Sequence, residues 1–217
     1  MDGSHLTEVS GQCYRPLGCY GPLSAVAALC MRRWDWTIEI IDPMPEKCVI
    51  VIYPHTSNWD FPVGLLTKWA AGLTAKRDAL RYAGKTSLFV WPWGWFFRAV
   101  GGLPVDRTGG SGFSEQLAER FTSEPRMRFV IAPEGTRSYR DHVRSSFYYV
   151  AKAAKVPIVL GTFDFENKRV RVAERFTPSD DANADLARID AYYRSITPMK
   201  GLGHTPANAA PWRFRQP

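Results

Sequence analysis

A histidine and an aspartate stand five positions apart in the stretch HTSNWD, where His55 is followed by Asp60. On one continuous helix the two side chains would point about 140° apart, so they meet only if His55 precedes a helix and Asp60 lies in its first turn. We expect Thr56 or Ser57 to cap this helix and Pro62 to lie in its first turn. Asp60 can then accept the Nδ1 proton of His55, which leaves Nε2 free as a general base.

This pair has a structural alternative, in which the hydrogen bond between His55 and Asp60 only stabilises a turn, and for an isolated pair that alternative is favoured. The chain has no Gly-x-Ser-x-Gly motif and no cysteine in an activating context. A catalytic His55 would therefore deprotonate a substrate hydroxyl or amine, which attacks an acyl group directly. The other histidines lack the spacing of metal ligands, so we expect no metal site.

Two arginines follow predicted strands further along the chain. Arg107 ends the stretch GGLPVDR, and Arg137 lies in APEGTRS, where Gly135 allows a close approach of the backbone. Arginines at neighbouring strand ends suit bidentate recognition of a phosphate. Alternatively, Arg107 forms a structural ion pair with Glu134, or Glu134 accepts a hydrogen bond from a substrate hydroxyl.

The order of these motifs resembles the glycerolipid acyltransferase family, which includes glycerol-3-phosphate and lysophosphatidate acyltransferases. Four blocks match in order, at residues 55–60, 102–107, 134–137 and 156–159. The resemblance implies that His55 is the base and that Asp60 orients it. It implies an acceptor-binding group formed by Arg107, Glu134, Gly135, Thr136 and Arg137.

The resemblance also implies the substrates. The donor would be a fatty acyl thioester on an acyl-carrier protein or coenzyme A, and the acceptor a hydroxyl of a lysophospholipid-like molecule, with no bound cofactor. The family commonly has a glycine where this chain has Ser145 and Ser146, and the chain lacks the long hydrophobic N-terminal helices of many members. A different acceptor, either another alcohol or an amine, therefore stays open.

The alternation of predicted strands and helices predicts an α/β fold: a single domain with a mostly parallel central sheet flanked by helices. The family resemblance implies that this fold is like that of glycerol-3-phosphate acyltransferase. The expected strands cover residues 37–41, 47–53, 80–85, 102–107, 126–135, 156–165 and 168–176. The expected helices cover residues 22–34, about 57–72, 91–101, 112–123, 145–155 and 182–196, and residues 1–20 are expected to be loop. We divide the chain into an N-terminal segment with a short amphipathic helix (1–34), an acyltransferase domain (35–200) and a C-terminal tail (201–217).

A dense aromatic cluster lies between two of the predicted strands and consists of Trp91, Trp93, Trp95, Phe96 and Phe97. These rings cannot all face one core, so we expect them to wall an acyl-chain tunnel or to enter a membrane interface, where tryptophan is favoured. An ordinary core helix is the alternative. Basic residues nearby suit anionic headgroups or an acidic carrier protein, although a solvated charged surface would look the same.

The net charge of +7 indicates an anionic partner. No segment reaches the length of a membrane span, and the N-terminus does not read as a signal peptide, so we expect a cytoplasmic protein associated peripherally with the inner face of the membrane. A non-catalytic lipid-binding or acyl-carrier-binding protein of the same fold is the rival hypothesis. Nucleic-acid binding is disfavoured, because the aromatic residues are not interleaved with arginines.

Overall fold

A seven-stranded sheet organises the chain, in the order β3-β9-β8-β4-β7-β5-β6. The computed structural model describes residues 8–9, 12–55, 57–74, 80–105, 112–135, 142–195 and 212–214. The strands are β3 (Thr37–Ile40), β4 (Lys47–Ile52), β5 (Leu80–Lys85), β6 (Gly102–Val105), β7 (Met127–Ile131), β8 (Ile158–Asp164) and β9 (Arg169–Phe176). Every neighbouring pair is parallel except β8 and β9, which confirms the predicted α/β fold with a mostly parallel sheet.

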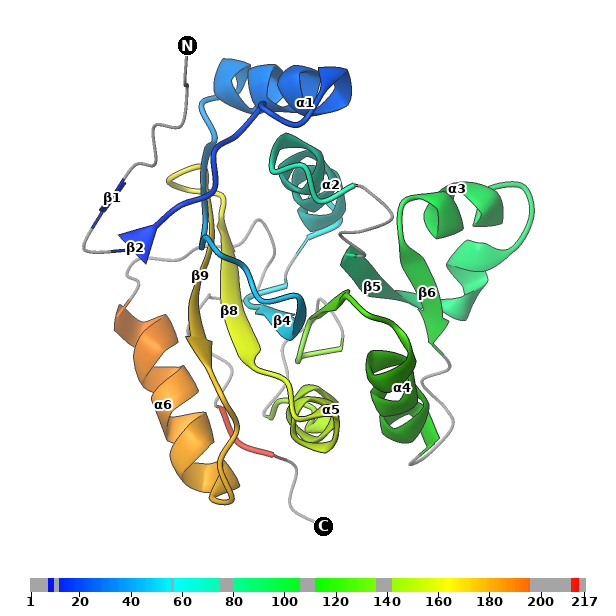
Figure 1. Ribbon diagram of the computed structural model, residues 1–217, viewed down its shortest axis with the longest axis vertical. Helices are drawn as coiled ribbons and strands as arrows, with labels where there is room; N and C mark the ends of the chain where they lie inside the picture. Colours follow the sequence, from blue (N-terminus) through cyan, green and yellow to red (C-terminus); the bar gives the residue numbers. More distant parts are fainter. Residues whose placement is uncertain are drawn as a thin grey trace.

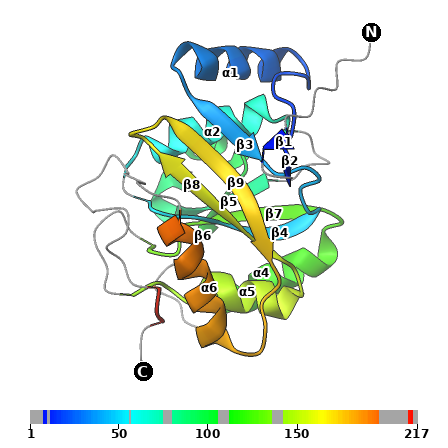
Figure 2. The ribbon, with the colours of Figure 1, turned by 90° about the vertical axis from the view of Figure 1, so that its left-hand side faces the viewer.

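Helices cover both faces of this sheet. They are α1 (Pro22–Arg33), α2 (Asp60–Ala70), α3 (Gly94–Ala99), α4 (Gly112–Ser123), α5 (Ser146–Ala154) and α6 (Ala182–Ser195), and η1 (Thr86–Phe89) is a short 3₁₀ helix. Figures 1 and 2 show α1 and α2 on one face and α4, α5 and α6 on the other. Each predicted helix is therefore present, with ends that differ by a few residues.

The central strand β4 contributes to a core on each face, because successive side chains of a strand point in opposite directions. Val49 and Val51 pack in the core formed with α4, α5 and α6. Ile50 and Ile52 pack in the core formed with α1 and α2. The near-continuous apolar run of this strand is thus explained by burial on both sides.

Two local details differ from the sequence-based expectations. A small hairpin of β1 (Glu8–Val9) and β2 (Gln12–Cys13) lies in the segment expected to be loop. The residue that caps α2 is Trp59 rather than Ser57, whose hydroxyl instead accepts a hydrogen bond from the backbone N–H of Trp59 at 3.1 Å. The expectation for Ser57 was wrong because the helix begins at Asp60, two residues later than a cap at Ser57 requires, and Thr56 lies outside the described residues.

The C-terminal segment, residues 212–214, packs beside the chain that precedes α5. Trp212 is buried in the core on that face and stacks on Tyr193, with ring centroids 5.1 Å apart. The backbone N–H of Val143 donates to the carbonyl of Arg213 at 3.0 Å. This contact ties the C-terminal segment to the loop that leads into α5, while the proposed domain boundaries stay predictions.

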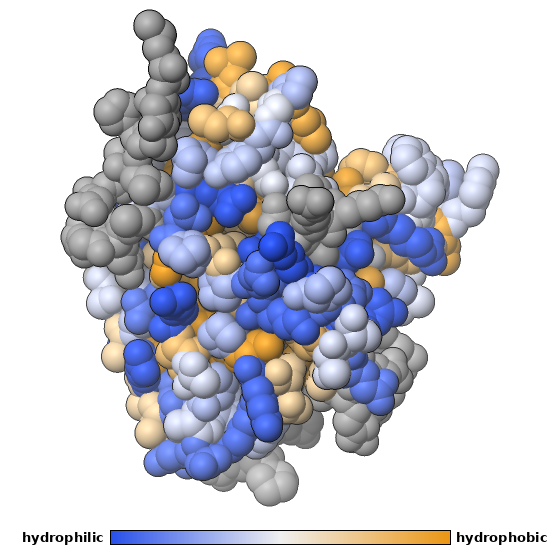
Figure 3. All heavy atoms as spheres, in the orientation of Figure 1, coloured by the Kyte–Doolittle hydropathy of each residue, from blue (hydrophilic) through white to orange (hydrophobic). Residues whose placement is uncertain are grey.

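The segment between β5 and β6, residues 86–101, projects from the edge of the molecule, and we call it the aromatic lobe (Figure 1). Trp91, Trp93 and Trp95 are 91%, 67% and 70% exposed. The rings therefore do not all face one core, while contact with an acyl chain or a membrane stays a prediction. A second exposed apolar surface lies on the outer side of α1, seen as orange spheres at the top of Figure 3, and includes Leu23 and Leu29.

Within the described residues, no helix combines the length and the apolar character that crossing a membrane requires.

Candidate active site

The carboxyl ends of two adjacent parallel strands bring His55 and Glu134 together. His55 follows β4 and Glu134 follows β7, and these strands pair in register, with Val51 opposite Ile131. The backbone N–H of His55 donates to Oε2 of Glu134 at 2.7 Å. Residues 79 positions apart are thus joined at the edge of the sheet where open α/β folds commonly bind their ligands.

The side chain of His55 contacts Asp60, with Nδ1 and Oδ2 separated by 2.6 Å. Asp60 is the first residue of α2, so the predicted layout, with the histidine before the helix and the aspartate in its first turn, is confirmed. An ionised carboxylate only accepts hydrogen bonds, so the proton of this contact belongs to Nδ1. Nε2 of His55 is consequently the nitrogen left to act on a substrate.

The carboxylate of Asp60 is held almost without access to water, since the residue is 4% exposed. Oδ2 also accepts from the backbone N–H of Ser57 at 3.4 Å, whereas Oδ1 is buried and has no hydrogen-bond partner among the described residues. The start of a helix stabilises negative charge. Burial, the helix end and the imidazole together direct this carboxylate towards His55.

Glu134 is also buried, with 4% of its surface exposed. Burial raises the pKa of its carboxyl to about 7, the backbone N–H of His55 lowers it, and the nearby charge of Asp60 raises it. Near pH 7, the carboxyl group of Glu134 is therefore partly protonated, next to the backbone N–H of His55. Its contact with the backbone of His55 was not expected from the sequence. The ion pair with Arg107 involves a residue outside the described ones, and acceptance from a substrate hydroxyl stays a prediction.

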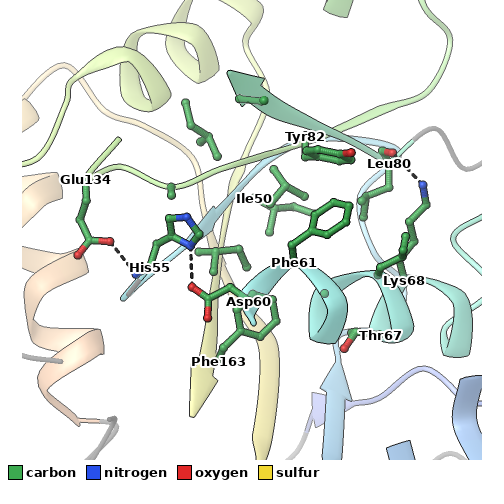
Figure 4. A pocket seen from close by; sticks show the side chains of 18 of the residues that line it. Ile50, His55, Asp60, Phe61, Thr67, Lys68, Leu80, Tyr82, Glu134 and Phe163 are labelled. Carbon is green, nitrogen blue, oxygen red and sulfur yellow. Dashed lines mark hydrogen bonds and ion pairs between the residues drawn. The ribbon is translucent and has the colours of Figure 1, made fainter. Parts of the chain in front are cut away.

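A cavity of about 1120 Å³ opens at His55 and continues between α2 and the sheet (Figure 4). His55, Asp60 and Glu134 line one end, and Lys68 lines another part. The wall between them is mostly apolar and includes Ile50, Ile52, Phe61, Leu65, Tyr82, Phe97, Val130 and Phe163. The arrangement places a potential base at the mouth of a groove suited to a hydrocarbon chain.

The other predicted site residues fall into two groups. Gly135 lines the cavity and has a φ of +64°, a conformation that favours glycine. Arg107, Thr136 and Arg137 lie outside the described residues. In the aromatic cluster, Phe97 lines the cavity, whereas the three tryptophans point their surfaces to solvent and Phe96 is partly buried in the aromatic lobe.

Arg144 is a candidate binding residue that the sequence analysis did not single out. It lines the cavity and lies so close to Gly135 that any side chain at that position would clash with its guanidinium. Arg144 is exposed, and no acidic partner for it occurs among the described residues. The sequence offered no signal for it, because its position beside Gly135 depends on the path of the loop.

The described residues contain no cluster of three or more His, Cys, Asp or Glu side chains that would hold a metal ion.

The comparisons with known proteins agree with the fold. Residues 35–160 match the family described as Acyltransferase. One similar solved structure is the 1-acyl-sn-glycerophosphate (LPA) acyltransferase PlsC from Thermotoga maritima, with a TM-score of 0.52 and 14% sequence identity, covering 79% of this chain and 77% of that chain. No curated protein matches the sequence. At this identity, the structural likeness shows a shared fold.

Replacing Glu134 with glutamine should remove part of the pH dependence of stability. The pKa of Glu134 rises from 4.5 to about 7 on folding, so the native state binds this proton more tightly than the unfolded chain does. The free energy of unfolding should therefore fall as pH rises from about 4.5 past 7, by on the order of 3 kcal/mol at most. Chemical denaturation across this range measures the effect.

The matched control for this experiment is Glu46→Gln, which removes an exposed carboxylate paired with Arg126. The Glu134→Gln variant keeps an acceptor for the backbone N–H of His55, and its stability should lack the decline, whereas the control should retain it. Parallel curves for Glu134→Gln and the unmodified protein would contradict the assignment.

Proposed function

The chain belongs to the acyltransferase family, and we propose that it moves a fatty acyl group from an acyl thioester to a hydroxyl of a lysophospholipid-like acceptor. The observation that carries this proposal is the contact between His55 and Asp60 at the mouth of an apolar cavity. A hydrocarbon chain fits the cavity wall, and the imidazole lies where the thioester carbonyl of such a chain would emerge. The donor is an acyl-carrier protein or coenzyme A thioester.

In this mechanism Nε2 of His55 takes the proton of the acceptor hydroxyl. The acceptor oxygen attacks the thioester carbonyl, the carbon–sulfur bond breaks, and the leaving thiolate takes the proton back from the imidazolium. Asp60 stabilises the imidazolium through its hydrogen bond to Nδ1. No covalent intermediate with the protein and no metal ion is needed to balance this reaction.

An anionic group on the acceptor would meet Arg144, which lines this part of the cavity beside Gly135. We assign Arg144 the phosphate, together with Arg107 and Arg137, which lie outside the described residues. Ser145 and Ser146 also line the cavity, where hydroxyls could bind polar groups of a smaller alcohol or an amine. Transfer to such a non-glycerolipid acceptor is therefore the second candidate function, and non-catalytic lipid binding is the rival.

Replacing His55 with alanine should lower the turnover number with an acyl thioester by roughly 10²–10⁴, the usual contribution of a general base. Asp60→Asn should also lower turnover, because the amide cannot stabilise the imidazolium. The matched control is Asp190→Asn, which removes a carboxylate that pairs with Arg194 on α6. Full activity of His55→Ala, measured by thiol release in a protein that remains folded, would remove the base assignment.

Replacing Arg144 with glutamine should raise the KM for a phosphate-bearing acceptor by roughly tenfold or more, since a hydrogen bond to a charged group contributes about 1.5–3 kcal/mol. Arg137→Ala should act in the same direction. Arg126→Gln is the control, because Arg126 pairs with Glu46 on the surface. Steady-state kinetics with the acyl donor at saturation separates the KM for the acceptor from kcat. An unchanged acceptor KM in either test variant would refute phosphate binding by the residue that was replaced.

The aromatic lobe is the proposed contact with the inner face of the membrane. Its exposed tryptophans suit the interface between headgroups and acyl chains, and Arg98 and Lys85 suit anionic headgroups. Leu88 belongs to this lobe and also lines the cavity. A lipid held at the lobe would therefore lie next to the groove that leads to His55.

Replacing Trp91, Trp93 and Trp95 together with serine should weaken binding to vesicles that contain an anionic phospholipid. We expect a loss of roughly tenfold or more, because a buried large apolar side chain contributes about 1.5–3 kcal/mol. Trp34→Ser is the control, since Trp34 is exposed at the end of α1 outside the lobe. Co-sedimentation measures the effect, and equal binding by the triple variant and the control would contradict the contact.

A further inference from the structure

Lys68 is a charged residue in an otherwise apolar stretch of the cavity wall, and the mechanism does not use it. It lies on the same helix as Asp60, and α2 rises about 12 Å between the two residues. Figure 4 shows Lys68 on the opposite side of the cavity from Glu134, with Ile50 between them. The groove thus has the catalytic pair at one end and an amine at the other.

The amine of Lys68 is fixed by backbone groups rather than by an acid. Nζ donates to the carbonyl of Val100 at 2.8 Å and to that of Leu80 at 3.4 Å. A Cβ on Gly101, which has a φ of +98°, would lie 3.1 Å from Nζ. The turn into β6 therefore holds the amine closely. An ammonium has three donors, so at least one remains for water in the groove.

The groove between His55 and Lys68 presents hydrocarbon. Ile50, Phe61 and Leu65 line it, and the hydroxyl of Tyr82 donates to the carbonyl of Phe97 at 3.2 Å, which satisfies this polar group internally. The hydroxyl of Thr67 also lines the cavity, is buried, and has no hydrogen-bond partner among the described residues. Between His55 and Lys68 a hydrocarbon chain would otherwise follow the apolar side chains of Ile50, Phe61 and Leu65.

Burial already disfavours the charged form of Lys68. Its pKa is lowered from 10.5 to about 8, first by burial and then by the positive charge of Arg81. A chain that reached the amine would remove its remaining water and supply no acceptor in return, which is unfavourable for a polar group. The amine of Lys68 therefore disfavours binding of an apolar ligand that is long enough to reach it.

We propose that Lys68 is a polar stop that sets the longest acyl chain accepted from the donor thioester. The inference rests on the proposed function, because the donor carbonyl must lie at His55. The donor is the occupant that fits, since the acceptor anion is assigned to Arg144, beside Gly135 at the other end of the cavity. The groove along α2 is then occupied by the acyl chain of the donor alone.

The test compares Lys68→Met, which removes the charge at similar length, with Lys68→Arg, which keeps it. Each protein receives an equimolar mixture of saturated acyl thioesters of increasing length, with one acceptor, and mass spectrometry gives the product lengths. For chains longer than the optimum of the unmodified protein, relative kcat/KM should rise roughly tenfold in Lys68→Met and stay unchanged in Lys68→Arg. An identical length profile in Lys68→Met and the unmodified protein would overturn the inference.

Two further measurements separate this inference from the proposed function. A series of acceptors with different chain lengths is run in the same way, and a shift there in place of the donor shift would overturn the assignment of the groove to the donor. If the unmodified protein transfers no acyl group, the proposed function fails. Calorimetric binding of free fatty acids of increasing length then tests the stop directly, and the longer acids should bind more tightly to Lys68→Met only.

Loss of the hydrogen bonds to Val100 and Leu80 could prevent Lys68→Met from folding, which thermal unfolding would reveal. Lys68→Gln then takes its place, because the amide keeps a donor for one carbonyl and carries no charge. Its length profile should shift in the same direction by a smaller factor, and an unshifted profile would overturn the inference.

Discussion

The hydrogen bond between His55 and Asp60 depends on where one strand ends and one helix begins. β4 ends at Ile52 and α2 begins at Asp60, and the chain between them turns the imidazole back towards the first turn of the helix. A buried carboxylate without a partner is costly, so the pair also stabilises the junction that creates it. A structural role for this contact is therefore compatible with the proposed catalytic one.

Two carboxylates hold the same histidine in different ways. Asp60 fixes the ring through Nδ1, while Glu134 fixes the main chain through the N–H of His55. Their charges oppose each other, because Asp60 raises the pKa of Glu134 beyond the effect of burial. Protonation of Glu134 removes one of the two negative charges beside the imidazole. The backbone contact of Glu134 is thus electrostatically coupled to the pair of His55 and Asp60.

The sequence predicted the parts of this site that depend on local patterns. The apolar run before His55 gave the strand, and the position of Pro62 gave the start of the helix within a few residues. The bond from His55 to Glu134 needed the pairing of β4 with β7, which no local pattern specifies. Lys68 and Arg144 were not predicted for the same reason. A basic residue on a helix or loop is usually solvated, and only the tertiary fold places these two residues in the lining of one cavity.

The charges along this cavity can keep two substrates apart. An arginine lies by Gly135 near the histidine, and an amine lies at the far end of the groove, with hydrocarbon between them. An anionic headgroup is favoured only at the exposed arginine, because the amine already donates to backbone carbonyls and sits behind an apolar wall that a phosphate would have to cross without water. A hydrocarbon chain has the opposite preference. In the proposed reaction, the groove would therefore orient a donor by its chain and an acceptor by its charge, and the two would meet at His55.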